Sequence, residues 1–318
     1  MFRISRRVHY DIRLVPDHRG TDLTDRRLTS SRAARQSSAP SATPNVFGRW
    51  VPRHLTGLHS FYTVPAMARK KASVASSPTT SNGVLIDRAT HTLTFTLDNS
   101  SQGNEVTGAM FDAMLAELRV EASKPRARVL RIRARGSVFC TGRERAGRTL
   151  SAIRLESARI IKFIAALRSS PLITVAEVQG DAFGFGFGLA IVCDFALVAD
   201  HASLAFPEVR SRLAPVVILS YLSEYALPRF AFPLVLFGEP IDPHRARQIG
   251  LISQVCSAER LAAEADTLVE RILRLDPSAV RRCKRFFLNA QQNPFDQNCR
   301  LAVDALTKGS LALLASKK

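Results

Sequence analysis

A glycine-rich stretch, GFGFG at residues 184–188, directly follows an apolar run with the character of a buried strand. The free N–H groups in the first turn of a following helix point outward and carry partial positive charge. Glycines let a ligand approach such a backbone closely. This turn suits the binding of a phosphate or the stabilisation of an oxyanion. Close packing without any chemistry is the third alternative.

The dinucleotide-binding pattern fits this stretch poorly. Its GxGxxG fingerprint requires a glycine where the chain has Leu189. Only residues 189–193 separate the glycines from the next expected strand, which is too short for a crossover helix. The sequence therefore favours an oxyanion hole, in which main-chain N–H groups stabilise a negative charge developing on a carbonyl oxygen.

Strands and helices interleave along the chain from residue 83 onward. The expected elements are a hairpin over 83–99, strands over 127–135, 172–178 and 194–200, and helices over 106–122, 150–170, 241–250 and 257–275. Asp242 and Asp276, each followed by proline, are typical of helix starts. We predict an α/β core over residues 83–255 and a helical region over 256–318.

Residues 1–82 differ from the rest in composition and lack sustained periodicity, which predicts a disordered basic extension. They carry 14 Lys and Arg against four Asp, so +10 of the total charge of +18 lies here. The Arg- and Ser-rich start resembles a mitochondrial transit peptide, but early acidic residues argue against one. Met67 is a candidate alternative start. We expect a cytoplasmic protein, with a mitochondrial one as the alternative if residues 1–66 are a transit peptide.

Several function classes are not favoured by the sequence. No apolar run reaches the roughly 18 residues of a membrane span. The basic surface suits anionic ligands, yet no zinc-finger spacing or RNA-recognition motif is present, so nucleic-acid binding is not favoured. RNA binding through residues 1–82 is left as an alternative. Five cysteines without a CxxC spacing predict free thiols and no metal site.

Three ordered blocks resemble the enoyl-CoA hydratase/isomerase (crotonase) family. They are RGSVFCTGRE at 135–144, AEVQGDAFGFGFGLAIVCDFALVADHASLAFPEV at 176–209 and FGEPIDPHRARQIGLISQV at 237–255. The likeness runs from about residue 83 to the C-terminus. It implies a spiral of ββα turns with a C-terminal helical region, assembled as a homotrimer or hexamer. The implied substrate is an acyl-CoA thioester, with coenzyme A as part of that substrate and no separate cofactor.

The resemblance also implies particular site residues. The oxyanion donors are the main-chain N–H groups of Arg143 and Phe185, and the catalytic carboxylate is Glu208. The implied substrate-binding positions are Cys140, Gly142, Gly184, Gly186, Phe187 and Phe206. Apolar side chains at such positions also fit plain core packing. Glu144, beside the first donor, is a reserve candidate for the acid.

The sequence departs from the family pattern at two places. Hydratases of this family use a second glutamate, and its position here is Gly188. A glycine-rich loop is replaced by LAPVVILSYL at 213–222. Hydration is weakened without the second carboxylate, whereas one carboxylate is enough to move a proton from C2 to C4 of a 3-enoyl thioester. We therefore predict Δ3,Δ2-isomerase chemistry. The alternatives are a hydratase-like enzyme with an atypical base and a catalytically weak CoA-binding assembly protein.

Overall fold

The computed structural model describes residues 79–315. Residues 1–78 lie outside this range, and with them most of the predicted basic extension. The candidate start at Met67 and the transit-peptide alternative also concern residues outside it. Among helices in the described range, none combines the length and apolar character that crossing a membrane requires.

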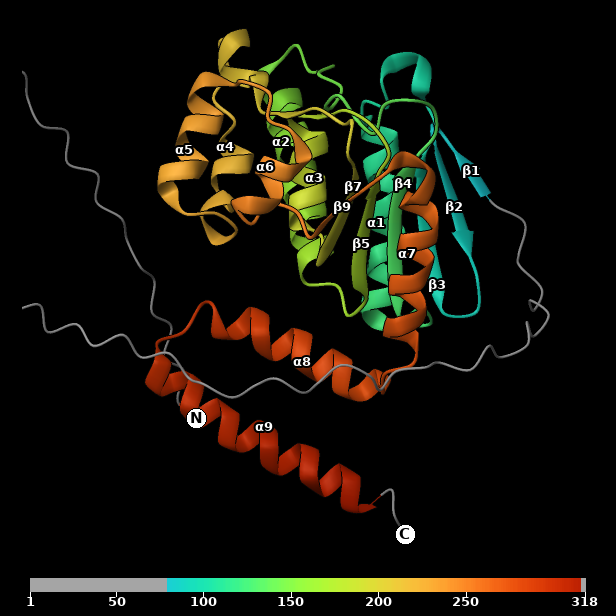
Figure 1. Cartoon of the computed structure of the whole chain (residues 1–318), viewed down its shortest axis with the longest axis vertical. Coiled ribbons are helices and arrows are strands. Elements are labelled where there is room, and N and C mark those ends of the chain that lie inside the picture. Colours follow the sequence, from blue (N-terminus) through green and yellow to red (C-terminus); the bar gives the residue numbers. More distant parts are fainter. Residues whose placement is uncertain (1–78, 316–318) are drawn as a thin grey trace, which may run out of the picture. The chain divides into compact units, whose positions relative to one another are not determined.

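A seven-stranded sheet runs through the described residues in the order β1-β2-β3-β4-β5-β7-β9 (Figure 1). The strands are β1 (Thr79–Ser81), β2 (Val84–Arg88), β3 (Thr92–Leu97), β4 (Val129–Ala134), β5 (Ile173–Val178), β7 (Phe195–Ala199) and β9 (Gln254–Cys256). β1, β2 and β3 pair antiparallel, which confirms the predicted hairpin, and the later pairs are parallel. Parallel strands align their carboxyl ends, so the loops after β4 and β5 leave the same edge of the sheet.

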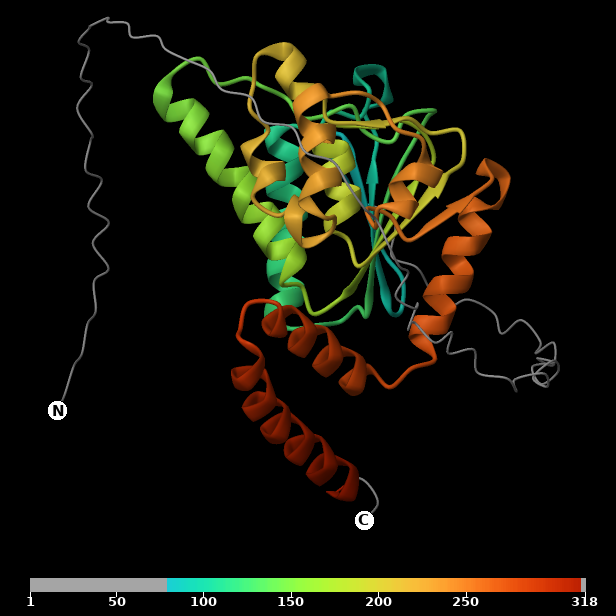
Figure 2. The same cartoon turned by 60° about the vertical axis from the view of Figure 1, so that its left-hand side comes forward.

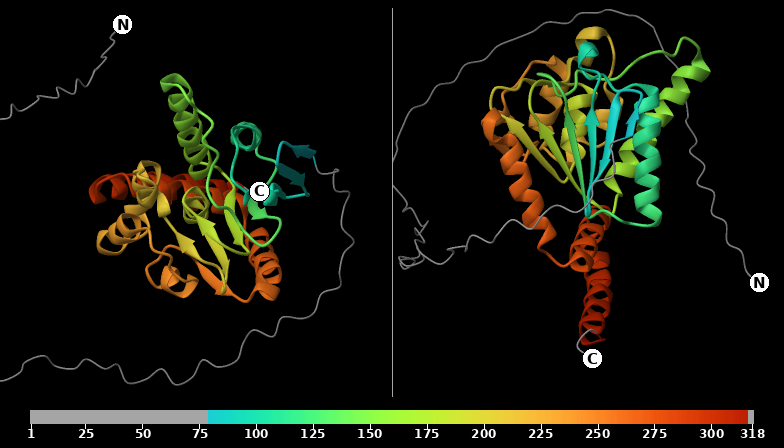
Figure 3. Two further views of the ribbon diagram at one scale, coloured as in Figure 1. Left: turned by 90° about the horizontal axis from the view of Figure 1, so that it is seen from above. Right: turned by 90° about the vertical axis from the view of Figure 1, so that its right-hand side faces the viewer.

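Helices cover both faces of this sheet (Figure 3). α1 (Gly108–Ser123), α2 (Leu150–Arg168) and α3 (Phe185–Val192) pack in the main core, and α7 (Ala258–Leu273) packs on the opposite face. Along β4, Val129 faces α7 and Leu130 joins the main core. Because alternate residues of a strand point to opposite faces, β4 buries an apolar side chain on each side here, while Arg131 on the α7 side pairs with Glu177 and Asp266.

Shorter elements lie between these strands and helices along the chain. They are η1 (Ser100–Gln102), β6 (Ala182–Phe183), β8 (Leu204–Ala205), η2 (Pro207–Ser211), α4 (Val216–Leu219), η3 (Leu222–Glu224), α5 (Pro228–Phe237) and α6 (Pro243–Gln248). β6 and β8 form a separate two-stranded parallel pair beside α3. This pair brings the glycine stretch next to η2, which carries Glu208.

The two predicted helix starts are confirmed. The Asp242 carboxylate accepts a hydrogen bond from the Arg245 amide (2.9 Å) at the start of α6. The Asp276 carboxylate accepts one from the Ala279 amide (2.7 Å) at the start of α8 (Pro277–Ala290). Each aspartate satisfies a main-chain donor that the first helical turn leaves without an intrahelical acceptor.

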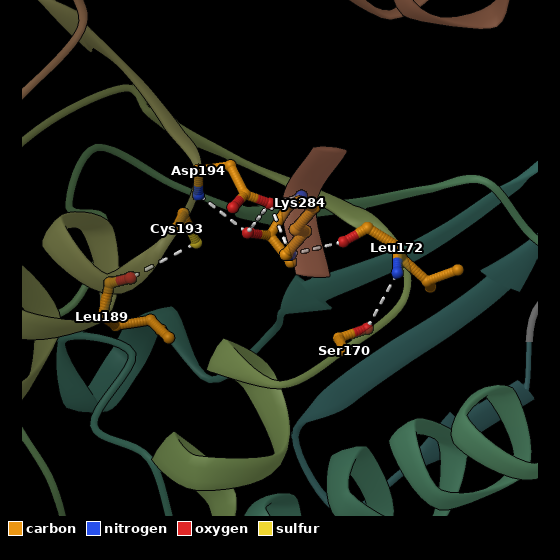
Figure 4. A network of polar contacts seen from close by, with 7 residues as sticks. Ser170, Leu172, Leu189, Cys193, Asp194 and Lys284 are labelled. Atoms are coloured by element: carbon orange, nitrogen blue, oxygen red, sulfur yellow. Dashed lines mark hydrogen bonds and ion pairs between the residues drawn. The ribbon is translucent and has the colours of Figure 1, made fainter. Parts of the chain in front are cut away.

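α8 is tied to the central sheet through one buried lysine. The Lys284 ammonium donates to the Leu172 carbonyl (2.6 Å) and the Asp194 carboxylate (2.6 Å), as Figure 4 shows. Asp194 also accepts from the amide and hydroxyl of Thr174 at the start of β5. α9 (Phe295–Ala315) follows α8 after a sharp turn (Figure 2). The C-terminal region is helical, as predicted, apart from its first residue, which ends β9.

Candidate active site

The glycine stretch forms the start of α3. Gly184 is the N-cap, with φ of 52° and ψ of −118°, a positive-φ conformation that favours glycine. Its amide donates to the Ala205 carbonyl (2.9 Å), and its carbonyl accepts from the Gly188 amide (3.0 Å). Phe185 is therefore the first helical residue, and its N–H has no intrahelical acceptor. The predicted strand, turn and helix are all present.

Each glycine of the stretch allows a different close approach. A Cβ at Gly186 would stand 2.1 Å from the Cys140 carbonyl oxygen, and a Cβ at Gly184 would stand 2.7 Å from Glu208 Oε1. A Cβ at Gly188 would stand 2.4 Å from the Tyr221 hydroxyl oxygen. The bare backbone thus serves close packing, and it also brings a carboxylate and a phenol against the same short helix.

The loop that carries Arg143 runs beside the start of α3. Cys140 and Ala182 form a parallel bridge, in which the Phe183 amide donates to the Cys140 carbonyl (2.9 Å). Arg143 and Phe185 each lie three residues beyond the bridged pair. The two expected donor turns are therefore neighbours that leave the bridge in the same direction.

The main-chain N–H of Arg143 is turned away from its bridge partner. Val106 pairs with this loop by donating to the Gly142 carbonyl (3.1 Å) and accepting from the Glu144 amide (3.1 Å). Because successive residues of an extended chain alternate in direction, the Arg143 amide faces the opposite side. No described group accepts a hydrogen bond from the Arg143 or the Phe185 amide.

One buried and one half-buried amide side chain fix the shape of the Arg143 loop. The fully buried Asn104 donates through Nδ2 to the carbonyls of Arg135 and Val138 (both 2.8 Å). Gln179 donates through Nε2 to the carbonyls of Gly136 (3.1 Å) and Val138 (3.0 Å). Our sequence interpretation missed both residues, since no local pattern predicts partners more than 30 positions away.

Glu208 lies in η2, directly after β8, with one oxygen fully enclosed. Its Oε2 is buried and has no hydrogen-bond partner among the described residues. Burial raises the pKa of this carboxyl group above its ordinary value, while the nearby Arg145 and Arg143 act in the opposite direction. The Glu208 carboxylate thus interacts electrostatically with arginines of the Arg143 loop and also lies against Gly184. A raised pKa suits a group that must both take and release a proton near neutral pH.

The aromatic residues of the stretch pack within the protein. The Phe185 ring contacts Phe111 edge-to-face, with centroids 5.1 Å apart, and the Phe187 ring stacks on Phe206 at 4.8 Å. Phe187 and Phe206 are both fully enclosed. These contacts are those of core side chains, and a role of Phe187 and Phe206 in substrate binding stays a prediction.

Cys140 and Glu144 have protein contacts of their own. The Cys140 thiol is buried and donates to the Gly142 carbonyl (3.2 Å), and burial raises its pKa to about 12, so it stays protonated. Glu144, the reserve acid, is exposed and accepts from the Gly108 amide (3.4 Å) at the start of α1. Neither arrangement suits a nucleophile or a buried base.

The cavities do not by themselves mark this site. A small cavity of about 80 Å³ lies beside Arg143, lined also by Phe111 and Glu156. Larger ones of about 730 and 880 Å³ lie against α8, and Glu208 lines neither of them. The site is therefore defined by its polar groups rather than by void size. Among the described residues, no group of three or more His, Cys, Asp or Glu side chains is arranged to hold a metal ion.

Comparison with known proteins decides the family. The sequence profile described as enoyl-CoA hydratase/isomerase matches residues 88–308. The chain belongs to the enoyl-CoA hydratase/isomerase family. Within it, a Xenopus laevis protein named enoyl-CoA hydratase domain-containing protein 3, mitochondrial, is 30% identical over 199 residues, which cover 60% of this chain and 66% of that protein. An enoyl-CoA isomerase/hydratase of Mycosarcoma maydis is 27% identical, covering 59% of this chain and 73% of that protein.

The family membership extends to the fold. A Thermobifida fusca protein solved in complex with CoA superposes with a TM-score of 0.66 at 28% identity, covering 74% of this chain and 95% of that one. The predicted crotonase-like α/β fold with its helical C-terminal region is confirmed. The matched part of the chain spans slightly less than two thirds of the length of the Xenopus relative.

Proposed function

We propose that this protein is an enoyl-CoA isomerase that moves a proton from C2 to C4 of a 3-enoyl thioester. Glu208 is the base, and the N–H groups of Arg143 and Phe185 hold the thioester oxygen. Family membership supports an acyl-CoA substrate, and one solved relative carries CoA. The observation that carries the proposal is the half-buried Glu208 carboxylate, whose enclosed Oε2 has no partner among the described residues, beside a helix start whose Phe185 amide has no acceptor.

The reaction follows from what these groups can do. Glu208 takes the proton from C2, and the electrons of that bond spread through the C3–C4 double bond and the carbonyl to give a dienolate. The two N–H groups stabilise the negative charge on the thioester oxygen. Glu208 then returns the proton to C4, which leaves a double bond between C2 and C3. No redox change occurs, so coenzyme A enters only as part of the substrate and no further cofactor is proposed. We expect full activity after dialysis against a metal chelator.

One carboxylate limits the site to this chemistry. Hydration requires a water molecule activated at C3 together with a proton delivered to C2. Gly188 supplies no second carboxylate for that water, and its Cβ position is already filled by neighbouring side chains. Isomerisation needs only one group that accepts and returns the same proton.

The test is conversion of 3-enoyl-CoA to 2-enoyl-CoA, followed by the ultraviolet absorbance of the conjugated thioester. We expect Glu208→Gln to lower kcat by about 100-fold or more, since it removes the proton acceptor. Glu144→Gln is the matched control, because Glu144 is exposed and contacts the start of α1. Unchanged activity in Glu208→Gln would contradict the proposal.

A hydratase with an atypical base is the second candidate. It is favoured by the name of the Xenopus relative and by the double name of the Mycosarcoma relative. Product analysis separates the two reactions, because hydration of 2-enoyl-CoA gives a 3-hydroxyacyl product and isomerisation does not. Saturable acyl-CoA binding without turnover would favour the assembly-protein alternative.

We also propose assembly as a homotrimer or hexamer. Large apolar side chains are exposed on the last two helices, including Phe287 (65%), Phe295 (79%) and Leu306 (71%). Clustered exposed apolar groups mark interaction surfaces. Light scattering of the purified chain measures its mass, and a monomer would contradict this proposal.

For the compartment, the two alternatives remain the cytoplasm and the mitochondrion. The Xenopus relative is named mitochondrial, which supports the second alternative. Fluorescent fusions of the full chain and of a chain that begins at Met67 distinguish them. A transit peptide predicts mitochondrial import of the first fusion only.

A further inference from the structure

A basic cavity lies between the C-terminal end of α2 and one face of α8. Its volume is about 730 Å³, and residues 169–171, which follow α2, also line it. Cationic side chains dominate the polar part of its wall, and no aspartate or glutamate contributes to it. The cations are Arg168, Arg281, Arg282, Lys284 and Arg285. The positive charge of this cavity is therefore not balanced within its own wall.

Two of the five cations are neutralised by acidic side chains that lie outside the cavity. Arg168 pairs with Glu224, and Lys284 pairs with Asp194 (2.6 Å). Lys284 also donates to the Leu172 carbonyl (2.6 Å), so its three donors serve mainly to hold α8 against the sheet. These two cations shape the cavity without leaving a net charge in it.

The other three cations have no acidic partner within residues 79–315. Neither Arg281 nor Arg285 forms an ion pair there, and Arg282 donates only to the Ser278 hydroxyl (2.8 Å). Arg281 and Arg285 are one helical turn apart, and like charges at this spacing repel each other and destabilise a helix. The cluster does not stabilise α8, so three guanidinium groups remain to bind an anion.

A buried hydroxyl also lines the cavity. Ser170 is 4% exposed, and its Oγ accepts from the Leu172 amide (3.2 Å), as Figure 4 shows. Its own O–H has no acceptor among the described residues. Oxygens of a phosphate group accept hydrogen bonds from hydroxyl and guanidinium donors alike. Ser170 therefore adds a neutral donor to the same wall.

The cavity has room for more than a phosphate group. Its volume falls in the range of about 300–1,000 Å³ that is typical of sites for organic ligands. Arg281, Arg285 and Asn289 follow one another by single turns along α8, so Asn289 lies about 12 Å beyond Arg281. The side-chain amides of Asn289 and Gln292 line the cavity and have no hydrogen-bond partner among the described residues. Amides both donate and accept, which suits the sugar and base of a nucleotide.

The cavity lies at the edge of the sheet opposite the candidate active site. Residues 169–171 directly precede β5, whereas the loops that carry Arg143 and Phe185 follow the carboxyl ends of β4 and β5. The six residues of β5 alone span about 20 Å. None of Arg143, Phe185 and Glu208 lines the cavity. A thioester at the candidate active site and a ligand in this cavity therefore occupy separate places.

We propose that this cavity binds a nucleoside diphosphate or triphosphate as a second ligand, with its phosphates on Arg281, Arg282 and Arg285. Guanidinium groups bind phosphate through paired N–H donors and keep their charge at every physiological pH. The inference goes beyond the proposed isomerase reaction and uses none of its groups. No bond is made or broken at this second site.

The experiment is a calorimetric titration with ADP of the full chain already saturated with butyryl-CoA, which occupies the substrate site. We expect one ADP to bind per chain. Pyrophosphate should bind at least about 10-fold more weakly and adenosine without measurable affinity, because each lacks one half of the ligand. The absence of ADP binding would overturn the inference, and so would an equal affinity for pyrophosphate, since the nucleoside would then not be recognised.

The double variant Arg281→Gln/Arg285→Gln should weaken ADP binding by about 100-fold, since each lost charge-assisted contact costs about 10-fold. The matched control is Arg300→Gln/Lys308→Gln on α9, which removes the same charge outside the cavity, and all four side chains are exposed. The control should keep ADP binding, and equal weakening by both variants would overturn the inference. Both should keep isomerase activity, whereas Glu208→Gln should lose it and still bind ADP, so the two proposals fail separately.

Discussion

Substitution of Gly186 by alanine tests whether the two donor turns are in contact. The added Cβ would lie 2.1 Å from the Cys140 carbonyl oxygen and 2.7 Å from Cys140 Cβ. Ordinary contacts of this kind begin at about 3.4 Å, so the turns must separate by roughly 1 Å. The obstacle is main chain, which no rotamer change removes. A shift of this size in catalytic geometry lowers the rate by about 100-fold.

We expect Gly186→Ala to lose about 100-fold in kcat/KM for 3-enoyl-CoA. Overpacking should also lower the free energy of unfolding by about 1–3 kcal/mol, or roughly 2–4 °C in Tm per kcal/mol. Gly309→Ala in α9 is the control, since a Cβ there meets nothing within 4 Å, and it should leave activity unchanged. A Gly186→Ala protein with normal activity and normal Tm would refute the reasoning, because the turns would then not touch.

Further predictions concern charge. Because burial raises the pKa of Glu208, kcat/KM should fall as pH drops through that raised value, and a profile with an ordinary carboxyl pKa would contradict this. Glu208 therefore keeps its proton to a higher pH in the folded state than in the unfolded state. Its contribution to the free energy of unfolding is lost as pH rises from about 4.3 through the pKa of the folded state. Glu208→Gln should therefore raise Tm at pH 7 and lose this advantage below about pH 4. Lys284→Met should cost about 1–3 kcal/mol in chemical denaturation, because it removes the hydrogen bonds from the buried ammonium to the Leu172 carbonyl and the Asp194 carboxylate, whereas Lys308→Met on α9 should cost little.

Local patterns in the sequence were enough to predict the framework of the fold. Asp242 and Asp276 mark their helix starts because an N-cap acts on amides only two or three residues away. The helix start at Phe185 was likewise readable, since the glycines that permit it are adjacent to it. The strands β6 and β8 were missed because a two-residue strand is too short to show an alternating pattern.

The parts of the site that join distant segments were not predictable in this way. Asn104 donates to the carbonyls of Arg135 and Val138, and the residues next to Asn104 in the sequence do not predict these partners. Tyr221 reaches Gly188 across more than 30 positions through a segment that departs from the family pattern. Such contacts depend on how the whole chain folds, so local patterns in a single sequence do not predict them.

The central claim is that two main-chain amides hold the thioester oxygen. A crystal structure of the full chain with a bound acyl-CoA measures this directly, through the distances from the Arg143 and Phe185 nitrogens to that oxygen. We predict that both distances fall at about 2.7–3.1 Å, with a Glu208 oxygen beside C2. A thioester oxygen bonded to neither amide, or an acyl chain that lies away from Glu208, would contradict the account.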